Sequence, residues 1–238
     1  MTYCLGIKLK SGLLGIADTR LTSGTEFSNG KKLFVHGKHK HSLFIMTSGL
    51  RSVRDKAITY FQEILDSDTV HYNKLYKAVN GFAEQLKRVA QEDKEYLSQS
   101  GLKFNLHAII GGQLEDDEEH KLFLLYPECN WVEVGEGSPF VIIGNSGYGK
   151  PLLNRALKYD SSLAFALKTG FLSFDSTRVS ANDVDFPIDV VRYEKDSFVL
   201  KEHRLEKKDV SDVSLFWQKK LRETIDEIPD KWMEKIIE

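Results

Sequence analysis

The first 34 residues read MTYCLGIKLKSGLLGIADTRLTSGTEFSNGKKLF, and this stretch decides the fold that we predict for the chain. Apolar-rich runs at 3–9 and 13–17 flank the turn residues Ser11 and Gly12, a pattern typical of a β-hairpin. Neither run alternates cleanly between apolar and polar residues. Because strands with one solvated face usually alternate, we expect this hairpin to be buried on both faces, between two layers of structure.

Three polar residues stand at the ends of these strands. Thr2 precedes the first run, Asp18 follows the second, and Lys32 precedes the next apolar run, after a loop. A fold that brings the three together would place a hydroxyl, a carboxylate and an ammonium in one site. Thr2 is also small enough for Met1 to be trimmed away, which would leave the threonine with a free α-amine.

Apolar periodicity predicts the remaining elements. Apolar residues that recur at intervals of three or four indicate amphipathic helices, whereas shorter apolar runs indicate strands. Further strands are expected at 33–36, 42–47, 104–111, 121–126, 131–134, 140–143, 188–192 and 198–201. Helices are expected from Gly49 to about Asp66 and at 75–90, 151–158, 161–172 and 211–228, with a break at Pro229 before a last short helix.

This order of strands, two helices, strands, two helices, strands and a helix predicts an α+β protein. Two sheets packed face to face, with a helix pair on each outer side, fit the order, so we predict a four-layer α-β-β-α sandwich. No change of composition and no repeat divides the chain. Residues 1–238 are therefore predicted to form a single domain, with a C-terminal helical extension at about 211–238.

Composition excludes several classes of function. The formal net charge is -2 and the isoelectric point is about 6.4, so the chain lacks the basic field that nucleic acids attract. No basic segment followed by an apolar one opens the sequence, and no apolar run reaches the roughly 20 residues of a membrane helix. Cys4 and Cys129 match no metal or redox spacing. We predict a cytoplasmic protein with reduced thiols and without nucleic-acid or membrane partners.

An N-terminal threonine is a known type of nucleophile. Its hydroxyl is weak until a base removes the proton, and a free α-amine, with a pKa of about 7.7–8.0, can be that base near neutral pH. Removal of Met1 would give Thr2 such an amine. Because a threonine in second position is by itself common, the neighbouring motifs decide whether this chemistry applies.

Those motifs resemble the β-type subunits of the proteasome and the bacterial HslV peptidase, which are N-terminal-nucleophile hydrolases. The similarity is carried by Thr2 at the head of a strand, by 17–20 closing the next strand and by 29–34 opening the third. It continues at 47–50 and 144–151, where strands lead into helices. The opening residues and the last of these segments resemble Anbu, the bacterial ancestral β-subunit family, more closely still.

The resemblance implies a threonine-type endopeptidase that hydrolyses amide bonds of peptides or unfolded proteins without a metal or another cofactor. Thr2 is then the nucleophile and Lys32 keeps it activated, since an ammonium stabilises the alkoxide and discourages protonation of the α-amine. Asp18 pairs with Lys32 and fixes its position, and Lys31 is the neighbouring alternative to Lys32. Related subunits work in rings or spirals, so a homo-oligomer is also implied, while an unfoldase partner stays open.

The resemblance assigns further residues around the nucleophile. Gly49 would supply the backbone N–H of an oxyanion hole, with Thr47 and Arg51 lining the pocket for the residue before the scissile bond. Arg51 would favour a polar or acidic residue there. Ser146 would support the threonine amine, together with an aspartate near the end of the fourth helix, for which Asp175 is our choice.

Two other functions compete with hydrolysis. Residues 144–150 fit the phosphate-binding pattern G-x-x-x-x-G-K between a strand and a helix, which would indicate nucleotide binding. However, Pro151 stands where a magnesium-binding hydroxyl is required, and the loop does not belong to an alternating β–α order, so nucleotide binding ranks second. A protein that keeps the peptidase fold for assembly, with little activity, is the third hypothesis.

Two groups of residues raise the question of a metal. His36, His39 and His41 lie in one lysine-rich turn, and 114–119 contains an acidic run. Metal sites need ligands that converge, and a run of charges is usually a solvated turn. We therefore predict no metal site and interpret both groups as exposed hairpin loops.

Overall fold

The structure is a computed structural model that describes residues 2–23, 25–67 and 70–237. Within these ranges the chain is a mixed α/β protein. Its strands are β1 (Tyr3–Leu9), β2 (Gly12–Asp18), β3 (Arg20–Ser23), β4 (Glu26–Asn29), β5 (Leu33–Lys38), β6 (His41–Gly49), β7 (Leu106–Gln113), β8 (Lys121–Leu125), β9 (Trp131–Glu133), β10 (Phe140–Gly144), β11 (Ile188–Glu194) and β12 (Leu200–Leu205). Its helices are α1 (Arg51–Asp66), α2 (Leu75–Gln99), α3 (Lys150–Ala156), α4 (Leu163–Ser180), α5 (Lys207–Asp226), the 3-10 turn η1 (Asp230–Trp232) and α6 (Glu234–Ile237).

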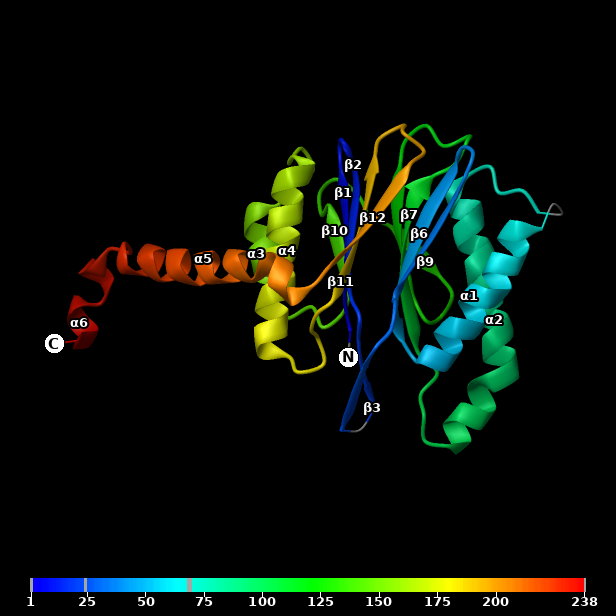
Figure 1. Cartoon of the computed structure of the whole chain (residues 1–238), viewed down its shortest axis with the longest axis horizontal. Helices are drawn as coiled ribbons and strands as arrows, with labels where there is room; N and C mark the ends of the chain where they lie inside the picture. The colour runs from blue at the N-terminus through cyan, green and yellow to red at the C-terminus, as the bar shows by residue number, and fades with distance from the viewer. Residues whose placement is uncertain (1, 24, 68–69, 238) are drawn as a thin grey trace.

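The described strands form three antiparallel sheets. Two have five strands each, in the orders β10-β1-β2-β11-β12 and β5-β6-β7-β8-β9, and the third is the short pair β3-β4. Figure 1 shows the two larger sheets together in the centre, with α3 and α4 on one outer side and α1 and α2 on the other. The predicted order of strands and helices therefore matches the observed order along nearly the whole chain.

The β1–β2 hairpin is buried on both faces, as the sequence predicts. All residues of both strands are buried. Tyr3, Leu5 and Ile7 pack in a cluster with side chains of α3 and α4. Cys4 points the other way, into the layer of side chains between the two large sheets. Successive side chains of β1 thus point alternately into two apolar clusters, whereas in a strand with one solvated face every second side chain would be polar.

The second large sheet is covered by α1 and α2. Phe61 and Phe82, one from each helix, belong to a buried cluster that also contains Ile45 and Phe123 of the sheet. The two phenylalanine rings meet edge to face, with their centroids 5.5 Å apart. The three- or four-residue spacing of apolar side chains therefore predicts these two helices correctly.

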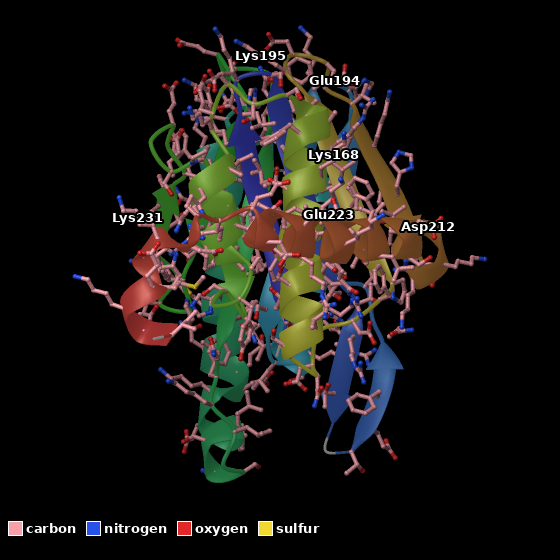
Figure 2. All side chains as sticks on the ribbon, turned by 90° about the vertical axis from the view of Figure 1, so that its left-hand side faces the viewer. Lys168, Glu194, Lys195, Asp212, Glu223 and Lys231 are labelled. Atoms are coloured by element: carbon pink, nitrogen blue, oxygen red, sulfur yellow. The ribbon has the colours of Figure 1, made fainter. Side chains whose placement is uncertain are left out.

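Helix α5 leaves the body formed by the other elements. Figure 1 shows it extending away from α3 and α4, with η1 and α6 at its far end. Ser214 is its one buried residue among those described, and charged side chains such as Asp212 and Glu223 stand on its surface in Figure 2. The sequence predicts a start at 211, but the helix begins at Lys207 because Glu206 and Asp209 form a capping box there.

Two other sequence-based expectations are wrong. The segment between Arg20 and Asn29 is expected to be a loop but belongs to the hairpin β3–β4, whose second strand is exposed throughout and so has no apolar pattern. Helix α4 is expected to end at 172 but continues to Ser180 with polar residues that are buried, among them Ser173 and Thr177. Within the ranges that the structure describes, no helix is long and apolar enough to span a bilayer.

Candidate active site

Thr2 is held by its backbone just before β1. Its carbonyl oxygen accepts a hydrogen bond of 2.7 Å from the Asn145 N–H. The next residue, Tyr3, donates its own N–H to Asp18 Oδ1 at 2.8 Å. Gly144 has a φ of +88°, and a Cβ on it would lie 1.9 Å from the Thr2 carbonyl oxygen, so glycine is required there. Segments distant in the sequence thus fix Thr2 from two sides.

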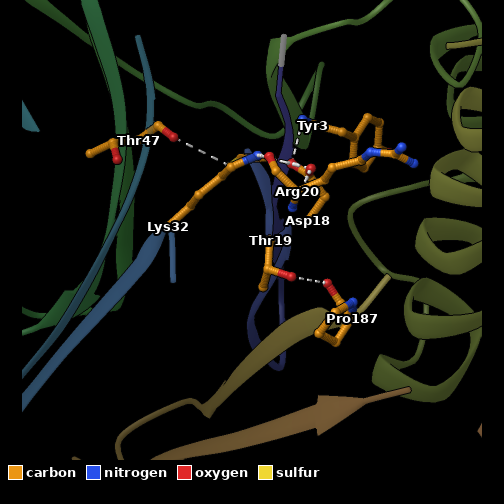
Figure 3. Close-up of polar contacts among 8 residues, drawn as sticks. Tyr3, Asp18, Thr19, Arg20, Lys32, Thr47 and Pro187 are labelled. Atoms are coloured by element: carbon orange, nitrogen blue, oxygen red, sulfur yellow. Dashed lines mark hydrogen bonds and ion pairs between the residues drawn. The ribbon is translucent and has the colours of Figure 1, made fainter. Parts of the chain in front are cut away.

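Asp18 and Lys32 form a buried ion pair next to this point (Figure 3). The exposed fractions of their side chains are 0% and 3%. Lys32 Nζ lies 2.7 and 2.8 Å from the two carboxylate oxygens of Asp18 and 2.7 Å from the carbonyl oxygen of Arg20. Because an ammonium has three N–H donors, these acceptors engage all of them. The structure therefore brings Asp18 and Lys32 together and holds the ammonium in one place.

The carboxyl group of Asp18 has an unusual acidity. Burial raises its pKa to about 6, although the charge of Lys32 and the hydrogen bonds from Lys32, Tyr3 and Arg20 act in the opposite direction. A carboxyl group with a raised pKa, paired with one buried cation beside a cleft, is typical of catalytic sites.

We expect Asp18 to titrate near pH 6 in the folded chain. Between the ordinary pKa of 3.8 and the raised value of about 6, the folded state binds more protons at Asp18 than the unfolded state does. Asp18 therefore adds its full contribution to the free energy of unfolding at pH values below 3.8. This stabilisation is lost as the pH rises through the raised pKa of about 6. Carboxyl-carbon NMR measures the titration, and Asp18→Asn identifies the signal. A titration near the ordinary pKa would contradict the expectation.

A cleft of about 870 Å³ opens beside Thr2. Thr2 and Gly144 line it from the β1–β10 side, and Gly49 and Arg51 line it from the junction of β6 and α1. The volume is that of a small-molecule or peptide-binding site. The other lining residues are Arg20, Leu21, Thr22, Ser28, Ser48, Leu50, Asn105, His107, Leu124, Tyr126, Ile142 and Ile143.

The junction of β6 and α1 requires a glycine. Gly49 has a φ of +149°, and a Cβ on it would lie 2.0 Å from the carbonyl oxygen of Asn105. Thr47, two residues earlier, is 3% exposed, and its hydroxyl has no hydrogen-bond partner among the described residues. Thr47 shares a separate cavity of about 240 Å³ with Lys32 and does not line the main cleft. Of the two residues expected to bind substrate, only Arg51 lies in that cleft.

Two arginines give the cleft positive charge. Arg51 lies at its rim, with a side chain that is 65% exposed and 3.3 Å from Asp55. Arg20 lies deeper, with Nη1 2.9 Å from Asp185 and its guanidinium 3.9 Å from the centre of the Phe27 ring. Within the described residues, Arg20 Nε has no hydrogen-bond partner although it is buried. The cleft therefore offers N–H donors and positive charge to a ligand.

The structure joins Asn145, the neighbour of Ser146, to Thr2, but it places Asp175 elsewhere. Ser146 follows the residue whose N–H holds the Thr2 carbonyl group. Asp175 is buried in α4, where its carboxylate accepts hydrogen bonds of 2.6 Å from Arg178 and 3.0 Å from Ser214 Oγ of α5. Neither Asp175 nor Ser146 belongs to the lining of the cleft. In the structure, Asp175 joins α5 to α4.

Asp183 is a carboxylate near the cleft that the sequence-based reasoning misses. It lies half-buried in the turn after α4. Burial raises its pKa, but further interactions, including a hydrogen bond with Thr22 and the charge of Arg20, outweigh this and lower the pKa. Thr22 and Arg20 both line the cleft. The long stretch between the predicted helix end at 172 and the predicted strand at 188 is the signal in the sequence, because a longer α4 moves the turn, and its aspartate, further along the chain.

Two backbone N–H groups of the segment 144–150 are engaged within the protein. Phosphate-binding loops point free N–H groups at their ligand. Here the Asn145 N–H is bonded to Thr2, and the Lys150 N–H is bonded to the carbonyl oxygen of Ser146 at 3.3 Å. These contacts argue against nucleotide binding, and the close approach of Gly144 to the Thr2 carbonyl group gives this glycine a part in holding Thr2.

Comparison with known proteins places the chain in a family. No protein-family profile and no curated protein matches it. Among solved structures, the Anbu (Gly-1) mutant from Hyphomicrobium sp. strain MC1 is 30% identical, with a TM-score of 0.88, over 96% of this chain and 98% of that chain. This chain belongs to the Anbu family.

Other Anbu structures agree. The helical assembly of the Anbu complex from Pseudomonas aeruginosa is 27% identical, with a TM-score of 0.90, over 95% of this chain and 97% of that chain. Anbu, the ancestral β-subunit, from Yersinia bercovieri is 27% identical, with a TM-score of 0.88, over the same shares. The resemblance to Anbu inferred from the opening residues and from the segment 144–151 is confirmed.

Proposed function

We propose that this member of the Anbu family is a proteasome-like threonine endopeptidase, an amide hydrolase whose nucleophile is Thr2 once Met1 has been removed. One observation carries the proposal: Thr2 lines the main cleft, and its backbone is joined through Tyr3 to the buried pair of Asp18 and Lys32. The two central sheets and the helices outside them fit the four-layer α-β-β-α sandwich of N-terminal-nucleophile hydrolases. Peptides or unfolded proteins are the substrates.

The reaction uses the two functional groups of one residue. The neutral α-amine of Thr2 takes the proton from Oγ, and Oγ attacks the carbonyl carbon of the scissile amide. The tetrahedral intermediate carries a negative oxygen, which the backbone N–H of Gly49 stabilises. Its collapse expels the amine product, which receives the proton, and leaves an ester on Thr2. Water, deprotonated by the same amine, then hydrolyses the ester and restores the hydroxyl.

Lys32 acts through its charge. Its three N–H donors are engaged by Asp18 and by the carbonyl oxygen of Arg20, so it is fixed and stays close to the backbone of Thr2. A buried positive charge stabilises a developing alkoxide and lowers the pKa of a nearby amine, which keeps that amine neutral. Asp18 is therefore a positioning residue for the ammonium.

Two other polar residues support the new N-terminus. Ser146 follows directly on the residue whose N–H fixes the Thr2 carbonyl. Asp183 interacts with Thr22 and Arg20, which both line the cleft. We assign to Asp183 the role that the sequence analysis gives to Asp175, support of the Thr2 amine. A carboxylate and a hydroxyl at these places would orient the α-amine by hydrogen bonds.

The cleft also suggests a preference among substrates. Arg51 stands at its exposed rim and Arg20 inside it, whereas no carboxylate belongs to the described lining. Charges of one sign in a binding groove favour side chains of the other sign. We expect acidic or polar residues before the scissile bond to be favoured.

Intact mass spectrometry with a threonine-directed covalent probe tests the proposal. We expect the probe to label only those chains whose mass corresponds to the loss of Met1, and peptide mapping should place the adduct on Thr2. A chain that keeps Met1 provides the internal control, because its Thr2 has no free amine. Complete retention of Met1, or processed chains that take up no probe, would instead support the third hypothesis, a peptidase-fold protein for assembly.

The proposed enzyme works as a homo-oligomer in a ring or spiral. The helical assembly of the Anbu complex from Pseudomonas aeruginosa is a precedent in this family. Helix α5 extends from the body and exposes large apolar side chains, with Leu215 64% and Phe216 62% exposed. Single isolated subunits rarely expose several large apolar side chains on one helix, so we assign this helix to contacts between subunits.

Two glutamates in α5 should dissociate the assembly. Leu215→Glu combined with Phe216→Glu puts charges into the apolar surface, and we expect light scattering after gel filtration to report a large loss of molecular mass. Gln218→Glu, an exposed polar position on the same helix, should leave the mass unchanged. An unchanged mass in the double variant would remove α5 from the interface.

A further inference from the structure

A cluster of two histidines and a glutamate lies at the end of the second sheet, far from Thr2. His41 begins β6, whereas Gly49 at the cleft ends it, so the two lie about 26 Å apart along an extended strand. His71 comes from the connection between α1 and α2, and Glu115 from the turn between β7 and β8. Three segments that are separate in the sequence thus meet at one place.

The potential ligand atoms of these residues converge. His71 Nε2 lies 2.5 Å and His41 Nε2 lies 3.9 Å from Glu115 Oε1, and the two imidazole centroids are 4.6 Å apart. One ligand atom from each residue can be chosen so that all three lie within 4.8 Å of one another. Tetrahedral coordination with bonds of about 2.0–2.1 Å places neighbouring ligand atoms about 3.4 Å apart, so small side-chain rotations suffice.

The backbone around the cluster is held by hydrogen bonds. The Asp116 N–H donates to the Asn73 carbonyl oxygen at 2.9 Å, and Asn73 Nδ2 donates to the Asp116 carboxylate. The buried carboxylate of Asp117 accepts the N–H groups of Leu75 at 2.8 Å and Leu114 at 3.0 Å. These bonds tie the segment that carries His71 to the turn that carries Glu115.

The position of His41 follows from the sheet. Ser42 pairs with Gln113 between β6 and β7. This register places His41, one residue before Ser42, opposite the start of the turn that leads to Glu115. The backbone positions of the three ligands are therefore fixed by the pairing of β6 with β7 and by the hydrogen bonds that hold the turn after β7.

We propose that His41, His71 and Glu115 bind a divalent transition-metal ion of the zinc type, with solvent at the fourth position. Two imidazole nitrogens and one carboxylate oxygen are a donor set that zinc prefers, and three protein ligands leave one position open. The residues line a cavity of about 690 Å³ that gives the ion access from solvent. A bound metal ion would cross-link the α1–α2 connection, through His71, to the β5–β6 hairpin, through His41, and would thereby stabilise the folded chain.

The surroundings select against hard cations. Lys38 and Lys40 line the same cavity, so the field there does not attract cations by charge alone. Mg²⁺ and Ca²⁺ need several oxygen ligands, whereas this cluster offers one carboxylate and two nitrogens. Binding therefore depends on imidazole coordination, and excess Mg²⁺ should not displace the ion.

Titration of the complete, tag-free chain with ZnCl₂ and with CoCl₂ tests the site. We expect about one ion per chain, a rise in melting temperature, and for Co²⁺ the intense visible absorption of four-coordinate geometry. His71→Ala and Glu115→Gln should each weaken binding at least about tenfold. His203→Ala, which removes an exposed histidine of β12, should bind the ions like the unaltered chain.

All variants are compared by circular dichroism in chelator, so that a folding defect is recognised before affinity is measured. Because the side chains of His71 and Glu115 are 64% and 37% exposed, the variants should fold normally. Zinc binding that survives both substitutions, or that is also lost in His203→Ala, overturns the assignment. Since no readout depends on peptide hydrolysis, a failure here leaves the proposal for Thr2 untouched.

Discussion

The Thr2→Ala chain should show no labelling by a threonine-directed probe and no peptide hydrolysis above background. Alanine keeps the free α-amine after Met1 removal but lacks the oxygen that forms the ester, so the covalent pathway is closed. The fold should persist, because the contacts that hold residue 2 involve its backbone carbonyl group and the Asn145 N–H. Intact mass with the probe and hydrolysis of a fluorogenic peptide are the measurements.

Thr2→Ser is the matched control. Serine keeps a hydroxyl and is also small enough for Met1 removal, so labelling should persist at a reduced rate. Equal melting temperatures for the three chains would show that the loss in Thr2→Ala is chemical. Labelling of Thr2→Ala at the rate of the unaltered chain would contradict the proposal and place the nucleophile elsewhere.

Lys32→Met should abolish most activity and also destabilise the fold. It leaves the fully buried Asp18 carboxylate without its cation, and breaking a buried pair in this way costs about 3–5 kcal/mol. Loss of the fixed charge beside the nucleophile should reduce the rate of labelling by about 100-fold or more. Urea denaturation and the kinetics of probe labelling measure the two effects separately.

A second substitution separates stability from chemistry. In the Asp18→Asn, Lys32→Met double variant no buried charge is left unpaired, so much of the stability should return while labelling stays slow. Lys31→Met is the control, because Lys31 is 47% exposed and its ion pair with Glu202 should contribute at most about 1 kcal/mol. If Lys31→Met slowed labelling more than Lys32→Met, the neighbouring lysine would be the activating one.

Much of the fold could be predicted because its central hairpin is apolar on both faces. The runs at 3–9 and 13–17 show this directly, and the helices α1 and α2 carry regular apolar stripes. Thr2, Asp18 and Lys32 could be singled out for the same reason. Each is a polar residue at the edge of an apolar strand, where burial requires a partner.

The parts that could not be predicted depend on contacts between distant segments. Helix α4 continues past 172 because the hydroxyl of Thr177 bonds to the Ser173 carbonyl oxygen and both residues are covered by neighbours. A pattern of apolar residues cannot reveal buried hydroxyls, so the sequence places Asp175 near the end of the helix, whereas the helix continues beyond it to Ser180. Likewise His71 and Glu115 are far apart in the sequence, and only the paired backbone of their loops brings them together.

The hydrogen bond from the Asn145 N–H to the Thr2 carbonyl oxygen affects when Met1 can be removed. An aminopeptidase needs an extended, accessible chain end. The N-terminal strand β1 pairs with β10, which ends only at Gly144 and is therefore synthesised much later. Ribosomes synthesise the intervening roughly 140 residues in on the order of ten seconds. Trimming during translation therefore acts on a terminus whose second residue is free, whereas trimming after β10 pairs acts on a chain in which the Asn145 N–H already holds the Thr2 carbonyl group. The fraction of chains that lose Met1 thus depends on the relative rates of elongation and processing, and faster translation should yield more chains that retain Met1.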